Sequence, residues 1–238
     1  MNIFFATAFY FAAAVITLGL GHKVFQYWST PTPFRIPITP APSTFPGVIL
    51  RMMGEVFLFK SLFKANKWIW LLGWVFHASL VLVMLQHLVY FMQQPPIWIY
   101  QLQPYSQLAA YPLLISLGGL LLRRFMVDRV RYISSPSDFL MLFLLIAIAS
   151  SGLLMLLVWP SNVYLIQQYF TGLLRLTINP LPDDLSLYLH LILVVILLLI
   201  FPFSKLLHAP GVFFSPTLNQ ADKTRQKQHQ SSKPREPE

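Results

Sequence analysis

Long apolar blocks, separated by short polar or basic connections, make up most of this chain. A helix needs about 20 apolar residues to cross the hydrocarbon core of a bilayer. Five blocks have lengths near this value, over approximately residues 3–20, 68–92, 108–122, 139–159 and 187–207. Because the apolar residues run continuously instead of alternating with polar ones, the pattern favours helices over strands. We therefore expect an all-α fold, an integral membrane bundle of five transmembrane helices.

The connections between the blocks differ in kind. Residues 30–46 are rich in proline and should be extended. Residues 49–67 mix apolar and basic side chains, which predicts an amphipathic helix on the cytoplasmic surface. Residues 161–178 predict a second surface helix, on the outer face. The chain is polar and basic from residue 217, so we expect a membrane domain over residues 1–216 and a disordered cytoplasmic tail over residues 217–238.

Local residues predict how the first span is processed and where the fourth and fifth spans end. No basic residue precedes the first block, which predicts a retained span rather than a cleaved signal peptide. Pro160 should stop the fourth span, and Pro202 should bend or end the fifth.

Basic residues fall almost entirely on one side of the predicted membrane. The chain has 17 Lys and Arg residues and a net charge of +9. All of them except Arg175 lie after the first span, after the third span or in the C-terminal segment. Since positive charge is concentrated in cytoplasmic loops, the N-terminus should be outside and the C-terminus in the cytoplasm. This bias accounts for the net charge without a nucleic-acid partner.

Composition excludes several classes of protein. Apolar residues make up 56% of the chain and charged residues 11%, whereas a soluble domain is about a quarter charged. The chain has no cysteine, which excludes disulfides, zinc–thiolate sites, thiolate-held iron–sulfur clusters and covalently attached haem. Any redox cofactor held by this chain must use other ligands.

Four of the six histidines are associated with predicted spans, where ionisable side chains are costly and usually functional. His77 and His87 are ten residues apart in the second span. His190 and His208 are eighteen residues apart in the fifth. The two spans run in opposite directions, so His77 should face His208 near the cytoplasmic side. His87 should face His190 nearer the outer side. One imidazole from each helix at each of two depths suits two stacked bis-histidine haems.

The axial spacings of these histidines disagree in ideal helices. His77 and His87 would be about 15 Å apart along the axis. Eighteen residues are five whole turns, so His190 and His208 would share one face, about 27 Å apart. Helix tilt and a bend at Pro202 must absorb the difference. Of the other two histidines, we expect His22 to be interfacial and His229 to be solvated.

Other interpretations of the four histidines remain open. Bundle histidines also form hydrogen bonds between helices. Zinc or copper would need three or four ligands at one point, whereas these histidines pair two by two. A non-redox anchor or transporter would favour acidic groups within spans, but Asp138 and Glu55 only flank them. Arg123 and Arg124 lie at the depth of the inner haem's propionates, although the bias of positive charge to the cytoplasm explains them equally well.

The spacing and several segments resemble a known family. The stretch from Phe201 to His208, FPFSKLLH, and residues 118–124, GGLLLRR, are similar to the last and third spans of the membrane cytochrome b (gamma) subunit of respiratory nitrate reductase, NarI. Residues 63–77, 128–134 and 208–217 more closely resemble its relative DsrM, from the sulfite-reductase-associated DsrMKJOP complex.

This resemblance implies two b-type haems, with His77 and His208 as axial ligands of the inner haem. His87 and His190 would be the ligands of the outer haem. It also implies electron transfer between membrane quinone and a cytoplasmic iron–sulfur partner similar to DsrK, alongside other membrane and periplasmic subunits, in the bacterial inner membrane.

The chain departs from the nitrate reductase pattern at two places. Gln86 replaces a glycine, and no lysine precedes the third span, where Gln101, Gln103 and Gln107 stand instead. These departures therefore favour a subunit of dissimilatory sulfur metabolism, with a nitrate reductase gamma subunit as the alternative.

Overall fold

A computed structural model describes residues 1–31 and 40–222. These residues form helices and turns with no strand, and five helices are long and apolar enough to cross a membrane. This confirms the expected helical membrane bundle. The spans are α1 (Asn2–Ser29), α4 (Lys67–His87) with η1 (Leu88–Phe91), α5 (Ile97–Met126), α7 (Pro136–Leu157), and α9 (Leu185–Ile200) with η2 (Phe201–Phe203). The predictions for His229, for the tail beyond residue 222 and for residues 32–39 of the proline-rich connection lie outside the described residues.

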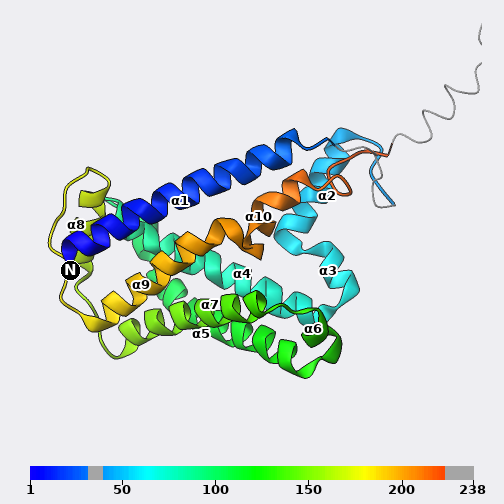
Figure 1. Cartoon of the computed structure of the whole chain (residues 1–238). Helices are drawn as coiled ribbons and strands as arrows, with labels where there is room; N and C mark the ends of the chain where they lie inside the picture. Colours follow the sequence, from blue (N-terminus) through cyan, green and yellow to red (C-terminus); the bar gives the residue numbers. More distant parts are fainter. Residues whose placement is uncertain (32–39, 223–238) are drawn as a thin grey trace, which may run out of the picture.

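The five long helices lie side by side, and the short helices gather at the two ends of the bundle (Figure 1). Helix α4 packs along α5, α5 on α7, α7 on α9, and α9 on α1. Helix α8 (Val163–Leu173) and the N-terminus lie at one end, which we call the α8 end. The opposite end, which we call the basic end, holds α2 (Phe45–Leu58), α3 (Lys60–Ala65), α6 (Asp128–Ile133) and α10 (His208–Gly211).

Helix α5 begins eleven residues earlier than the apolar pattern predicts, at Ile97 instead of Leu108. Its first three turns contain glutamines and Pro104, which interrupt the apolar run, and Pro112 follows within the helix. Each proline removes one backbone donor, a loss that membrane helices tolerate. The three glutamines expected in a loop, Gln101, Gln103 and Gln107, therefore lie on this helix.

Helix α8 lies at one end of the bundle, with Val163 and Tyr164 exposed and its other face packed on the spans. Residues 169–173 are all buried, and Tyr169 has no exposed surface. The Tyr169 hydroxyl donates to the Asn2 carbonyl at 2.9 Å, and the Tyr10 hydroxyl donates to the Leu173 carbonyl at 2.8 Å. Phe5, Leu187 and Leu191 pack into the same cluster. Helix α8 is thus the centre of an apolar core that closes the α8 end.

The predicted amphipathic helix over residues 49–67 is broken into two pieces. Phe59 adopts a left-handed conformation, with φ 48° and ψ 46°, between α2 and α3. The indole N–H groups of Trp70 and Trp74 donate to the carbonyls of Leu58 and Phe57, at 2.7 and 3.2 Å. These bonds satisfy carbonyls freed at the end of α2 and hold the break against α4.

The fifth span ends before His208, as expected from Pro202. Helix α9 stops at Ile200, η2 contains Pro202, and Ser204 is extended, with φ −103° and ψ 168°. A second short turn, η3 (Lys205–Leu207), leads into His208. His190 and His208 therefore do not lie on one continuous helix, and the ideal-helix spacing of five turns does not apply to them.

Candidate functional site

The structure brings the four span histidines together in two pairs. The ring centroids of His77 and His208 lie 5.9 Å apart, with the ring planes at 90°. The centroids of His87 and His190 lie 6.4 Å apart, with the planes at 26°. These are the partners expected from the depth of each histidine in antiparallel spans. Ligation of haem iron by the pairs stays a prediction.

Three of the histidines donate a hydrogen bond to the backbone of their own segment. Nδ1 of His77 lies 2.7 Å from the Gly73 carbonyl, and Nδ1 of His87 lies 2.7 Å from the Val83 carbonyl. Nδ1 of His208 lies 3.1 Å from the carbonyl of Lys205. A carbonyl only accepts, so Nδ1 carries the hydrogen in each ring. In the neutral ring, Nε2 then has a free lone pair.

The fourth histidine reaches the same state through a side chain. Nδ1 of His190 lies 2.9 Å from Oγ of Ser151 on α7. The Ser151 hydroxyl lies 2.9 Å from the Ile148 carbonyl, to which it donates its one hydrogen. Oγ therefore accepts from His190. All four neutral imidazoles then leave the Nε2 lone pair available and use Nδ1 for orientation, the arrangement that is usual around bound metals.

The spacing of each pair fits one six-coordinate iron between two rings. An imidazole nitrogen lies about 2 Å from a bound transition metal, and adding about 1.1 Å from nitrogen to ring centre puts two opposed centroids roughly 6.2 Å apart. The two observed distances bracket that value. Three of the rings are half-buried and that of His208 is exposed, so the surrounding side chains leave the rings accessible.

A site of the zinc type does not fit as well. In the described parts of the chain, no group of three or more His, Cys, Asp or Glu side chains gathers at one point. Two histidines at each level would suit a planar cofactor that supplies the other ligands itself.

A buried carboxylate holds the segment before His208 at the basic end. Asp138, in the first turn of α7, is 7% exposed. Its Oδ2 accepts from Nζ of Lys205 at 2.8 Å and from the Ser135 backbone N–H at 3.0 Å. The carbonyl of the same Lys205 accepts from His208. The Asp138–Lys205 ion pair therefore ties the His208 segment to α7. This role of Asp138 was not expected from the sequence, although the Ser135–Asp138 spacing is typical of a capping box.

The predicted propionate contacts of the two arginines stay predictions. Arg124 is half-buried, donates to Ser134 Oγ at 2.7 Å and lies 3.7 Å from Asp138. Arg123 is half-buried beside it. Gln86 is also notable, because its buried side-chain oxygen has no hydrogen-bond partner among residues 1–31 and 40–222.

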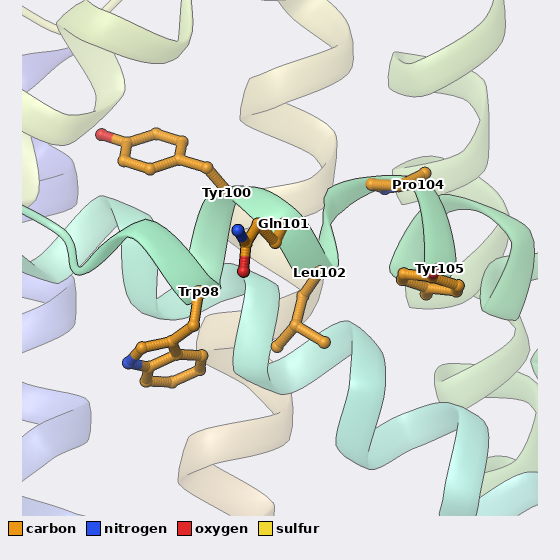
Figure 2. Close-up of a pocket in the computed structure, with 6 residues that line it drawn as sticks. All are labelled: Trp98, Tyr100, Gln101, Leu102, Pro104 and Tyr105. Carbon is orange, nitrogen blue, oxygen red and sulfur yellow. The ribbon is translucent and has the colours of Figure 1, made fainter.

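A pocket of about 700 Å³ lies along the first turns of α5. Figure 2 shows Trp98, Leu102 and Tyr105 on one side of the helix and Tyr100 on the other. Gln101 and Pro104 complete the lining. Residues 92–96 connect η1 directly to α5, which packs along α4. The pocket is therefore at the end of α4 that carries His87.

Known proteins resemble this chain over most of its length. A sequence model described as nitrate reductase gamma subunit matches residues 44–219. An Archaeoglobus fulgidus protein, the Hdr-like menaquinol oxidoreductase cytochrome b-like subunit, is 29% identical over 92% of this chain and 80% of its own length. Its counterpart from Archaeoglobus profundus is 27% identical over 96% of this chain and 82% of its own length.

Proposed function

This chain belongs to the nitrate reductase gamma subunit family, and on that premise we propose that it is the dihaem cytochrome b subunit of a menaquinol-linked oxidoreductase. In this proposal the His87–His190 pair and the His77–His208 pair each hold one b-type haem. The observation that carries it is the pair geometry: two imidazole pairs with centroids 6.4 and 5.9 Å apart, each ring oriented through Nδ1.

The chain contributes ligation, orientation and distance. When bound, each haem would accept and release one electron at a time, chemistry that the side chains of this protein do not supply. Helix α4 sets the two levels about 15 Å apart, since ten residues separate His77 from His87. The Nδ1 hydrogen bonds fix the ring planes and increase the basicity of Nε2.

We propose that quinol binds in the α5 pocket, beside the His87–His190 pair. A volume of about 700 Å³ is within the range of small-molecule sites. The Trp98 and Tyr105 rings, on the same side of the helix, provide apolar faces for a quinone ring, and the Gln101 amide provides a hydrogen bond to its oxygen.

Quinol-driven reduction of the purified, haem-loaded protein tests this site. Gln101 and Gln103 are both exposed on α5, but Gln103 does not line the pocket. We expect Gln101→Ala to raise the KM for a menaquinol analogue several-fold and Gln103→Ala to leave it unchanged. Equal KM values in both variants would place the quinol elsewhere.

The proposed partner is a cytoplasmic iron–sulfur subunit similar to DsrK, with sulfur metabolism as the pathway. The absence of cysteine in this chain means that iron–sulfur clusters must be on another subunit. In this proposal the N-terminus is outside, so that the basic end and the His77–His208 pair would face that partner. The family match favours a second candidate, a nitrate reductase gamma subunit. Purification of the native complex separates the two: an iron–sulfur protein of sulfur metabolism supports the first, and a molybdenum enzyme the second.

A non-redox anchor or transporter is the rival from another class. This rival explains the four histidines as hydrogen-bonding groups. It gives no reason why all four use Nδ1 for their hydrogen bonds, or why the ring centroids of each pair lie about 6 Å apart. If the folded protein takes up no haem when haem is added, that result would favour this rival.

A further inference from the structure

Resting on the proposed function, we propose that Ser151 is a positioning residue that sets the electron affinity of the haem held by His87 and His190. Ser151 orients His190 from a different helix. Its role would be specific to one haem, because its hydroxyl contacts none of the other three histidines in the hydrogen bonds that the structure describes.

One of the four histidines, His190, is held differently from the other three. His77, His87 and His208 donate to backbone carbonyls three or four residues earlier in the chain. Those acceptors are present whatever the side chain at that position. His190 instead donates to a side chain 39 residues away, beside a backbone interaction with Ile148, so a single substitution can remove its side-chain acceptor.

The surroundings fix the direction of this hydrogen bond. Ser151 is 5% exposed, and its only hydrogen is engaged by the Ile148 carbonyl on the previous turn. Its free lone pairs therefore point away from that carbonyl and toward His190. The next residue is Gly152, where an added Cβ would lie 3.4 Å from Cε1 of His190, so α7 lies close along the imidazole edge.

An acceptor at Nδ1 makes Nε2 a stronger electron donor to a bound metal. A stronger donor stabilises the oxidised iron, which carries the extra positive charge, and lowers the reduction potential. Loss of the Ser151 hydroxyl removes the acceptor at 2.9 Å and leaves the Ile148 backbone as the remaining partner, so the polarisation of Nδ1–H becomes weaker. The haem should then be easier to reduce.

Optical redox titration of the purified dihaem protein tests the inference. We expect Ser151→Ala to shift the oxidised–reduced equilibrium of the His87–His190 haem toward the reduced form by roughly three- to tenfold, where tenfold corresponds to 59 mV for one electron. The second haem should not change. The affected haem is identified as the one missing from His87→Ala. The low-spin EPR signal of the same haem should also move, because the ring is free to turn.

Two variants serve as controls. Ser150→Ala removes an exposed hydroxyl from the adjacent residue, and Ser151→Thr keeps a hydroxyl at the same position. Both should retain the wild-type potential. If Ser151→Ala does not retain haem, Ser151→Cys provides the test, because a thiol is a weaker acceptor. An intermediate shift in that variant supports the inference, and a wild-type potential overturns it.

The outcomes separate this inference from the function on which it rests. Wild-type protein without haem overturns the proposed function. Wild-type protein with two haems, and a potential unchanged in Ser151→Ala or shifted equally in Ser150→Ala, overturns only the role of Ser151.

Discussion

The two histidine pairs are built in different ways. His87 and His190 both lie on regular helices, their rings are nearly parallel, and both are half-buried. His208 follows a broken helix, is exposed, and meets His77 with its ring perpendicular. Near the first pair, the buried core around α8 closes the bundle. Near the second, the ion pair between the buried Asp138 carboxylate and the exposed Lys205 holds an irregular segment.

Similar ring spacings therefore do not require similar backbone structures. Two rigid helices fix the His87–His190 pair through packing. The His77–His208 pair depends on a few polar contacts and one close helix approach, at Gly19 of α1. Damage to those contacts should therefore affect the second pair and leave the first intact, so the comparison can be tested one end at a time.

The largest effect should come from Asp138→Ala. It removes a buried acceptor that holds Lys205 and the start of α7, at a cost of about 3 kcal/mol of stability. We expect loss of the His77–His208 haem and retention of the His87–His190 haem, measured by haem content and optical spectra. Asp128→Ala, which breaks an exposed ion pair with Arg131, is the matched control. Loss of both haems from Asp138→Ala would mean that the two ends are not independent.

Gly19→Ala should have the next largest effect. An added Cβ would lie 2.5 Å from Cβ of Pro202, so α1 or η2 must move. Overpacking of this kind costs about 1–3 kcal/mol, and the displacement should lower haem occupancy at His208. At Gly21 nothing lies within 4 Å of the added atom. Gly21→Ala should keep wild-type occupancy, and equal losses in the two variants would point to a general effect on α1.

Tyr169→Phe should have the smallest effect and should act at the α8 end. It removes one buried hydrogen bond to Asn2, which contributes about 1 kcal/mol. Thermal unfolding should show a modest loss of stability with both haems retained. Tyr164→Phe, at an exposed position, should change nothing. A loss of the His77–His208 haem would contradict the separation of the ends.

The same residue predicts a dependence on pH. Burial, reinforced by nearby Tyr10, raises the pKa of Tyr169 from 10.0 to about 12. Because the unfolded chain ionises first, this contribution to stability is complete below pH 10 and is lost as the pH rises toward about 12. The alkaline loss of stability should therefore be smaller in Tyr169→Phe.

Continuous apolar runs were enough to predict the five spans, because burial in lipid demands little else of a helix. The early start of α5 escaped prediction because Pro104 and the glutamines interrupt that run. The packing partners of α8 escaped prediction, since amphipathic composition does not reveal what an apolar face packs against. The histidine partners followed from depth alone in antiparallel spans. The contacts that orient the rings did not follow, because Asp138 and Lys205 are 67 residues apart and Ser151 is one small residue within an apolar block.

Haem content of the purified protein tests the central claim most directly, by pyridine haemochrome and a reduced-minus-oxidised spectrum. We expect about two b-type haems per wild-type chain and about one in each of His87→Ala and His208→Ala. The exposed histidine of α1 provides the control, since His22→Ala should keep both haems. Folded protein that takes up no haem, or histidine variants that keep both, would contradict it.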